Sequence, residues 1–452
     1  MTTSVSIARV TGDEVLDSRG NPTVQVTVVL NDGSLSRAAV PSGASTGEYE
    51  AKELRDGDPH RYGGRGVTQA VRHVNELIGP ALRGLAADDQ WRIDATLIEL
   101  DGTEFKERLG ANATLGASIA CARVAAQVCG LPLFRYLGGD GARVLPVPML
   151  NVLNGGSHGH GGPDFQEFMI VPLGAPTYRE ALRYGVETYH ALRTLLVERH
   201  EPTNLGDEGG YVPALPSNEA ALDLLMQAIE RAGYRPGEDI ALALDCAAAG
   251  LWRDERYDLE QEGRCLTTDE MMDLCGRWAD RYPIVSFEDP FIDNDWDAYA
   301  NLTRYLGGRL QIAGDDLFVS NRSFLVRGIA QRCCNAVIIK PNQVGTITET
   351  LNTARMALSA GYACTVAHRS GETEDTSIAD LAVALNCGQI KAGAPARGER
   401  VAKYNRLLTI ESTLGEQAEY AGRAAFRPRR GTHSIPSGHE AGAGESRPAG
   451  AS

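Results

Sequence analysis

Apolar residues gather in six short segments in the second half of the chain, and each segment ends on a residue that can take part in chemistry. Parallel strands covered on both faces consist of nearly continuous apolar residues, so each segment predicts a buried parallel strand. Successive segment ends lie 43, 27, 25, 28 and 23 residues apart, and most intervals hold the sequence of one amphipathic helix. This alternation predicts an αβ-barrel. The segments are IALALD (240–245), IVSFE (284–288), LQIAGD (310–315), AVIIK (336–340), CTVAH (364–368) and CGQIK (387–391).

The residues that close these segments are unusual as a set. In αβ-barrels the active site lies at the carboxyl ends of the strands, so charged residues placed there are catalytic candidates. One charged strand end needs no explanation, because the chain must leave the core somewhere. Six in succession indicate a functional site at the barrel mouth, formed by Asp245, Glu288, Asp315, Lys340, His368 and Lys391.

The first third of the chain has a different pattern. Residues 3–40 alternate between apolar and polar positions, and the turn sequences SRGNP (18–22) and NDG (31–33) divide them into three strands. This pattern predicts an antiparallel meander. From about 67 to 130, apolar residues recur at three- and four-residue spacing, which predicts helices. The fold class is therefore α/β, with an N-terminal α+β domain over residues 1–135.

Two further features complete the predicted organisation. The Gly- and Pro-rich segment 132–149 separates the first domain from a barrel domain over 140–425. Residues 427–452 have almost nothing to bury and are predicted to be a disordered tail.

Composition narrows the class of protein. The net charge of −15 argues against a nucleic-acid binder, and nine scattered cysteines without a C-x-x-C pair favour a reduced, cytoplasmic setting. The N-terminus does not resemble a signal peptide. No apolar run approaches the ~18–20 residues that a membrane-spanning helix needs.

The three carboxylates at the mouth suit a hard cation. Mg²⁺ prefers oxygen ligands from one or two carboxylates together with water and substrate phosphate. Asp245, Glu288 and Asp315 are therefore predicted metal ligands. The alternative is that each carboxylate pairs with a neighbouring Arg or Lys.

The two lysines are predicted to have different tasks. Lys340 closes an apolar strand near the predicted cations, which disfavours its ammonium form, so we expect its pKa to fall and the amine to act as a base. The alternative is a plain salt bridge to one of the carboxylates. Lys391 is better suited to holding an anionic substrate.

Three loops add weaker candidates. NLGDEGGYVP (204–213) sets Asp207 and Glu208 beside two glycines, and taken alone it is a surface turn. HRSGETED (368–375) sets Arg369 and Ser370 beside a strand end, where Arg offers a planar fork that suits phosphate. The loop 154–168 carries His158, His160, Gln166 and Glu167, and its His-x-His spacing is a weak metal signal.

Together these residues supply a metal site, a lysine base, a carboxylic acid and a phosphate-binding pair. A reaction that needs all of them is removal of a proton α to a carboxylate followed by loss of a β-hydroxyl. The dianionic intermediate of that reaction requires strong cationic stabilisation.

The chain resembles the enolase family from about residue 4 to 422. The motifs that carry the resemblance are DSRGNPTV (17–24), PSGASTG (41–47), QEFM (166–169), GDEGGY (206–211), LDCAA (244–248), FEDPF (287–291), GDDLF (314–318), IKPNQVGT (339–346), HRSGETED (368–375), GQIKAG (388–393) and VAKYNRLL (401–408). The resemblance implies an enolase-type, TIM-like barrel whose first units break the regular alternation. It also implies Mg²⁺-dependent, reversible dehydration of 2-phosphoglycerate to phosphoenolpyruvate.

The resemblance assigns roles by position. Lys340 would remove the C2 proton, and Glu208 would protonate the departing hydroxyl with help from Glu167. His368, counted among the catalytic residues, would line the substrate pocket with His158, Gln166 and Lys391, and Arg369 and Ser370 would bind phosphate. Asp245, Glu288 and Asp315 would hold one Mg²⁺, and Ser42, on a closing loop, would help to hold a second that arrives with substrate.

The resemblance also implies a homodimer or an octamer in the cytoplasm, with a secondary cell-surface or secreted pool as in some members of the family. The sequence departs from the family's usual residues at His160, Ala367, Ala392 and Gly398, but every residue with a predicted catalytic role is present. Two alternatives stay open: a relative acting on another acid, and a non-catalytic binding protein.

Overall fold

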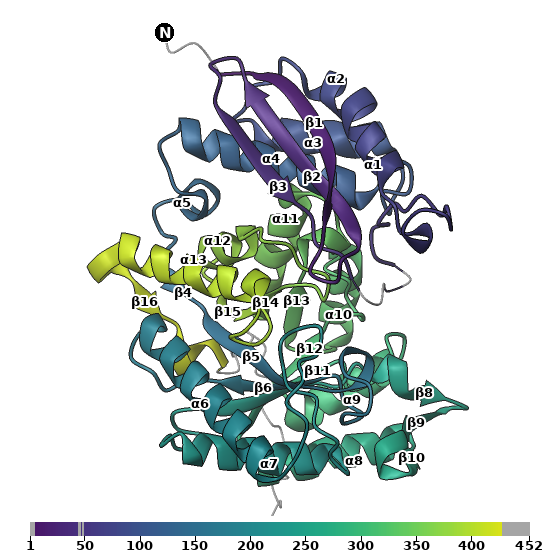
Figure 1. Ribbon diagram of the computed structural model, residues 1–452, viewed down its shortest axis with the longest axis vertical. Coiled ribbons are helices and arrows are strands. Elements are labelled where there is room, and N and C mark those ends of the chain that lie inside the picture. Colours follow the sequence, from purple (N-terminus) through teal and green to yellow (C-terminus); the bar gives the residue numbers. More distant parts are fainter. Residues whose placement is uncertain (1–4, 44–46, 48, 427–452) are drawn as a thin grey trace, which may run out of the picture.

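The computed structural model describes residues 5–43, 47 and 49–426 (Figure 1). The chain begins with an antiparallel sheet in the order β1-β2-β3, formed by β1 (Ile7–Leu16), β2 (Pro22–Leu30) and β3 (Leu35–Ala39). The two turns fall where the sequence predicts them, and Gly20 and Gly33 there adopt φ of 75° and 88°. Such angles favour glycine, which has no Cβ to clash. The meander prediction is confirmed.

Helices cover one face of this sheet. α4 (Ala111–Val128) packs on β2 and β3, and its Gly116 allows close approach, because a Cβ there would lie 2.6 Å from Val26 Cγ2. Around it lie α1 (Thr68–His73), the π-helical η2 (Val74–Ile78), α2 (Gly79–Leu82), α3 (Gln90–Asp101) and, further along, α5 (Leu133–Gly138).

The rest of the chain forms a closed barrel of eight strands in the order β11-β12-β13-β14-β15-β5-β6-β7. All six predicted strand segments belong to it, which confirms the barrel prediction. The strands are β5 (Val147–Asn154), β6 (Glu167–Val171), β7 (Ala241–Asp245), β11 (Ile284–Glu288), β12 (Gln311–Gly314), β13 (Ala336–Ile339), β14 (Ala363–Ala367) and β15 (Gly388–Lys391).

Helices surround the barrel in Figure 1. They are α6 (Tyr178–Glu198), α7 (Asn218–Arg231), α8 (Thr268–Arg281), α9 (Trp296–Leu306), α10 (Arg322–Gln331), α11 (Ile347–Ser359), α12 (Ser377–Ala384) and α13 (Gly398–Leu414). A side sheet follows β7, with β8 (Trp252–Arg253), β9 (Arg256–Leu259) and β10 (Arg264–Leu266). β4 (Val144–Leu145) pairs with β16 (Glu419–Tyr420). The short 3-10 helices are η1 (Tyr62–Gly64), η3 (Gly156–His158), η4 (Ala248–Leu251), η5 (Glu260–Glu262), η6 (Pro341–Gln343), η7 (Gly415–Gln417) and η8 (Gly422–Phe426).

One strand breaks the parallel order of the barrel. β6 is antiparallel to both β5 and β7, and two helices, α6 and α7, separate β6 from β7. Because of this reversal, Glu167 at the start of β6 lies opposite Asp245 at the end of β7. The loop 155–166 and Glu167 therefore reach the same barrel end as the six predicted strand termini.

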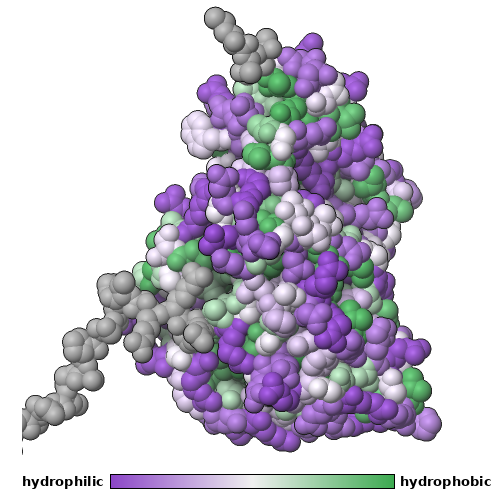
Figure 2. Space-filling model, turned by 90° about the vertical axis from the view of Figure 1, so that its left-hand side faces the viewer, coloured by the Kyte–Doolittle hydropathy of each residue, from purple (hydrophilic) through white to green (hydrophobic). Residues whose placement is uncertain are grey.

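Alternate strand residues face different environments. Leu244, Ile312 and Val337 belong to the main apolar cluster with the surrounding helices, whereas Ala313 and Ile338 belong to a separate small cluster. This is the alternation expected when one side of each strand faces the helices and the other faces the barrel interior. Figure 2 shows a mostly hydrophilic outer face with scattered hydrophobic residues. No helix in the described part of the chain is long and apolar enough to cross a membrane.

The N-terminal domain contacts the barrel at the loops that follow β13 and β14. Ala51 N donates to Gln343 O at 2.9 Å, Ser42 N donates to Gly371 O at 2.8 Å, and Ser18 N donates to Glu372 O at 2.7 Å. The N-terminal domain therefore borders the barrel mouth. The predicted tail, 427–452, lies outside the described residues.

Candidate active site

The structure brings most of the predicted site residues to one cavity at the barrel mouth. The strands place them there, since Asp245, Glu288 and Lys391 end β7, β11 and β15, and Asp315, Lys340 and His368 directly follow β12, β13 and β14. The predicted residues that line the cavity are His158, Gln166, Glu167, Glu208, Asp245, Asp315, Lys340, His368, Arg369, Ser370 and Lys391.

Ser42 and Glu288 do not line this cavity. Glu288 is completely buried, and its Oε1 lies 2.7 Å from Lys391 Nζ. Ser42 Oγ donates to Asp17 Oδ2 at 2.7 Å and accepts from Arg19 Nη2 at 3.1 Å. The hydroxyl of Ser42 is thus occupied by side chains of its own domain. Residues 44–46 and 48 of the predicted closing loop lie outside the described residues.

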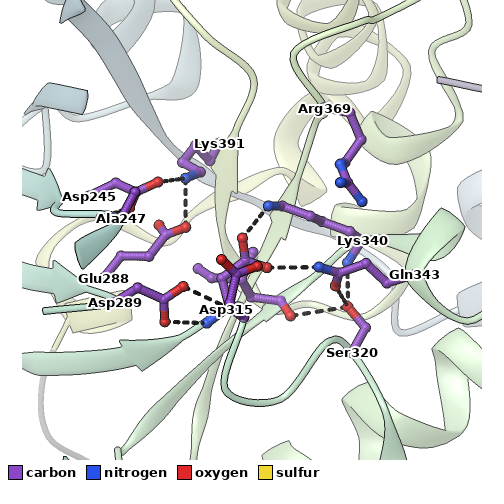
Figure 3. Close-up of polar contacts among 12 residues, drawn as sticks. Asp245, Ala247, Glu288, Asp289, Asp315, Ser320, Lys340, Gln343, Arg369 and Lys391 are labelled. Carbon is purple, nitrogen blue, oxygen red and sulfur yellow. Dashed lines mark hydrogen bonds and ion pairs between the residues drawn. The ribbon is translucent and has the colours of Figure 1, made fainter. Parts of the chain in front are cut away.

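Lys391 joins three buried carboxylates, and Figure 3 shows its contacts with two of them, Asp245 and Glu288. Its Nζ lies 3.2 Å from Glu167 Oε1, 3.1 Å from Asp245 Oδ2 and 2.7 Å from Glu288 Oε1. Burial lowers the pKa of Lys391, but these carboxylates outweigh burial and raise it well above its usual value. The alternative in which carboxylates pair with a lysine therefore holds for Asp245 and Glu288 here.

Lys340 forms a short ion pair with Asp315, drawn in Figure 3. Burial lowers the pKa of Lys340, yet the charge of Asp315 overrides burial and the pKa is raised. The sequence-based expectation of a falling pKa is therefore wrong for this structure, because the nearest charge is an anion rather than a cation. A divalent cation on Asp315 would compete with the ammonium group for the same carboxylate.

Asp289 organises the turn that carries Asp315. Its two carboxylate oxygens accept from Asp315 N at 2.9 Å and Asp316 N at 2.8 Å, and Tyr299 Oη donates to it at 3.2 Å. Burial, then the charge of Asp316, raises the pKa of Asp289 well above its usual value. Burial, then Asp315, raises the pKa of Asp316 to about 7.

Asp289, Asp315 and Asp316 form one group whose ligand atoms all lie within 4.8 Å of one another, and His158, Glu167 and Glu208 form another. Among the described residues, neither group includes Asp245 or Glu288. Lysine ammonium groups hold those two carboxylates and that of Asp315 in this structure.

The carboxylates at the mouth nevertheless fit a hard cation. Glu288 Oε2 and Glu167 Oε2 are buried and have no hydrogen-bond partner within the described part of the chain. A buried carboxylate oxygen without a partner is costly, and a cation would remove that cost. The donor atoms are all oxygens, which suits Mg²⁺.

Glu208 and Glu167 have pKa values displaced in opposite directions. Burial raises the pKa of Glu208, but His368 and His158 outweigh it and the pKa falls well below its usual value. Burial and the charge of Glu208 raise the pKa of Glu167 well above its usual value, despite Lys391. Glu167 is therefore the better proton holder of the two in this structure, and Glu208 is the ionised one.

Arg369 and Ser370 line the same cavity, and Arg369 is linked to Asp315 through Glu50 and Gln343. Arg369 Nη1 is 2.9 Å from Glu50 Oε2, and Gln343 Nε2 donates both to Glu50 Oε1 at 3.2 Å and to Asp315 Oδ1 at 3.1 Å. Ser370 Oγ is buried and has no partner within the described ranges. A hydroxyl donor without an acceptor beside a guanidinium group is an arrangement that suits an anion.

Two protein-family models match the chain. The model described as "Enolase, N-terminal domain" matches residues 7–137, and "Enolase, C-terminal TIM barrel domain" matches residues 142–429. The chain belongs to the enolase family. Membership in the enolase family implies a lyase-type enzyme that uses a divalent metal and binds a small-molecule substrate.

Sequence reasoning missed three buried charged residues of this enolase-family site. Asp289 lies in FEDPF and has φ of 41°, Glu50 follows the predicted closing loop, and Arg400 lies near the start of α13. None ends a barrel strand, so the strand-end argument could not find them. The sequence offered only one indication of these residues: each is a charged residue that lies inside a family motif or next to one.

Proposed function

We propose that this chain catalyses the reversible, Mg²⁺-dependent dehydration of 2-phosphoglycerate to phosphoenolpyruvate in glycolysis and gluconeogenesis. The main support is one cavity lined by a lysine amine, a carboxylate cluster, a carboxyl pair with divided pKa values, and Arg369 with Ser370. Each of these groups answers one requirement of that reaction.

Lys340 is the proposed base for the C2 proton. Its amine accepts a proton only when neutral, and its ion pair with Asp315 opposes this state. Loosening that pair is the event that would free the amine. Mg²⁺ held by Asp245, Glu288 and Asp315 would supply positive charge against the carboxylate of the substrate. A second Mg²⁺ near Ser42 belongs to the same proposal.

Glu208 and Glu167 are the proposed source of the proton for the leaving hydroxyl. Ligand atoms of the two carboxyl groups lie within 4.8 Å of one another. Glu167 favours its protonated form, so it would hold the proton before Glu208 presents it to the substrate. Two carboxyl groups whose surroundings separate their pKa values are a usual basis for such a division of roles.

Arg369 and Ser370 are the proposed phosphate ligands, and His158, Gln166, His368 and Lys391 complete the proposed substrate pocket. A homodimer or octamer in the cytoplasm, and the domain limits 1–135 and 140–425, are part of the same proposal.

The test separates the two proton transfers. Purified protein with Mg²⁺ and 2-phosphoglycerate should form phosphoenolpyruvate, followed by its absorbance, and EDTA should stop the reaction. Lys340→Ala should lose both product formation and exchange of the C2 hydrogen with D₂O. Glu208→Gln should lose product formation but keep the exchange, because the base is intact.

Each variant is compared with wild type for its circular dichroism and Tm, so that unfolding is not mistaken for lost chemistry. Turnover of an unphosphorylated hydroxy acid but not of 2-phosphoglycerate would show that the substrate assignment is wrong. Full activity of Lys340→Ala would show that the base is another group.

A further inference from the structure

Arg400 is completely buried, and the proposed reaction has given it no role. It lies in the first turn of α13, and its guanidinium group reaches the cavity wall. Nη1 lies 2.5 Å from His368 Nδ1 and donates to Arg369 O at 2.6 Å. Nη2 donates to Ser370 O at 2.5 Å and to Asp207 O at 3.2 Å.

These contacts decide where His368 carries its proton. A guanidinium group has only N–H donors and stays protonated in proteins. The His368 nitrogen that faces it must therefore be an acceptor, so Nδ1 has no hydrogen. A neutral imidazole then carries its hydrogen on Nε2, which lies 3.3 Å from Glu208 Oε2 without forming an aligned hydrogen bond to it in this structure.

We infer that Arg400 is a positioning residue that holds His368 as the neutral Nε2–H tautomer and so sets its N–H on the side of the ring nearest Glu208. The consequence for catalysis rests on the proposed function, but the tautomer itself does not. Either other form of the ring, with hydrogen on Nδ1 alone or on both nitrogens, would bring an N–H against the N–H of Arg400.

Burial favours the same neutral state of His368, and the charges that face the ring oppose one another. Arg400 and Lys391 both disfavour the imidazolium form, and Glu208 favours it. Burial adds to the two cations, and the pKa of His368 falls to about 4. The ring is then neutral at physiological pH.

Arg400 also joins two loops that carry proposed site residues. It binds the carbonyl groups of Arg369 and Ser370 after β14 and that of Asp207, which directly precedes Glu208. Lysine offers three donors from one point and cannot span acceptors on separate loops, whereas the planar fork of arginine can. We therefore expect the position to need arginine, not only a positive charge.

The test reads the tautomer directly. In wild-type protein labelled with ¹⁵N at histidine, the His368 signals, assigned by their loss in His368→Gln, should show a protonated Nε2 and an unprotonated Nδ1 throughout pH 5.5–8.5. In Arg400→Met, which keeps an apolar stem but removes the donors, hydrogen should appear on Nδ1 and the His368 pKa should rise. Product formation should fall by about 10-fold or more.

Arg406→Met is the matched control. Arg406 lies on the same helix, pairs with Asp380 at 2.6 Å and has no contact with His368 among those the structure records for the described residues, so its substitution should leave the His368 signals unchanged.

Wild-type His368 with hydrogen on Nδ1 would overturn the inference, and so would an unchanged tautomer in Arg400→Met. If Arg400→Met does not fold, Arg400→Gln replaces it, because its amide oxygen can accept a hydrogen from Nδ1 and the same shift of hydrogen to Nδ1 is expected. The NMR spectrum reports the tautomer whether or not the protein turns over 2-phosphoglycerate. Failure of the proposed activity and failure of the tautomer inference are therefore separate results.

Discussion

Replacing Lys391 with methionine isolates the energetic role of the buried ammonium group. The side chain is 2% exposed and contacts Glu167, Asp245 and Glu288, which are also buried. Removing one partner of a buried ion pair costs about 3–5 kcal/mol, because charge is left without compensation. For 452 residues the unfolding entropy is about 1 kcal/mol per kelvin, so Tm should fall by about 3–5 °C.

Mg²⁺ should reverse much of this loss. The carboxylates that Lys391 releases are hard oxygen donors, and Glu288 Oε2 and Glu167 Oε2 already have no hydrogen-bond partner within the described ranges. A cation at about 100 times its Kd adds about 2.7 kcal/mol to stability. Differential scanning calorimetry with and without Mg²⁺ should therefore show a larger gain in Tm for Lys391→Met than for wild type.

Lys403→Met is the matched control for this experiment. Lys403 is completely buried and lies 2.6 Å from Glu372 Oε2, outside the carboxylate cluster. The Lys403→Met variant should lose a similar amount of stability, but Mg²⁺ should not restore that stability. Equal responses of the two variants to Mg²⁺ would refute the reasoning, as would a Lys391→Met protein whose Tm matches that of wild type.

Three further predictions follow from other buried or capping contacts. Glu50→Gln removes the counterion of Arg369, a contact of the 1.5–3 kcal/mol class, and should raise KM for 2-phosphoglycerate about 10-fold or more in steady-state assays; an unchanged KM would remove Glu50 from this role. Thr267→Ala breaks the capping box with Glu270 and should cost about 1 kcal/mol in urea unfolding without changing turnover. His368 has a folded pKa of about 4, below its usual ~6.5, so its contribution to stability is present above pH 6.5 and is lost as pH falls toward 4. Between pH 7 and 5 the free energy of unfolding should fall by about 2 kcal/mol for this reason. His368→Gln should flatten that part of the plot of unfolding free energy against pH.

The barrel could be predicted because its strands are read by composition alone. Segments such as 240–245 and 336–340 are apolar on both faces up to their last residue, which is chemically active and lies at the same barrel end. The reversed strand β6 could not be found in this way. Its sequence, EFMIV, is as apolar as the parallel strands, and strand direction leaves no mark on composition.

The candidate site could be predicted as a set of residues but not as a set of contacts. The strand ends brought Asp245, Lys340 and Lys391 together as expected, whereas the direction of the Lys340 pKa depended on which charge was nearest. That charge is Asp315, and its placement follows from hydrogen bonds to Asp289 that no spacing rule contains. Sequence patterns predict at the end of which strand a residue lies. The packing between elements determines which partner its side chain contacts.

The charges at the mouth explain why such contacts matter. Burial alone raises the pKa of a carboxyl group, and the net direction depends on whether the nearest cation or histidine faces one carboxylate or is shared by several. Asp315 beside Lys340 has a lowered pKa, and so does Glu208 beside His368, whereas Glu288 shares Lys391 with two other carboxylates and its pKa stays raised. The lysines therefore do not compensate every carboxylate at the mouth. Glu288 and Glu167 favour their protonated forms, and each has a buried carboxyl oxygen without a hydrogen-bond partner within the described part of the chain. A site built in this way gains stability from added positive charge, which is the property that a metal-dependent lyase requires.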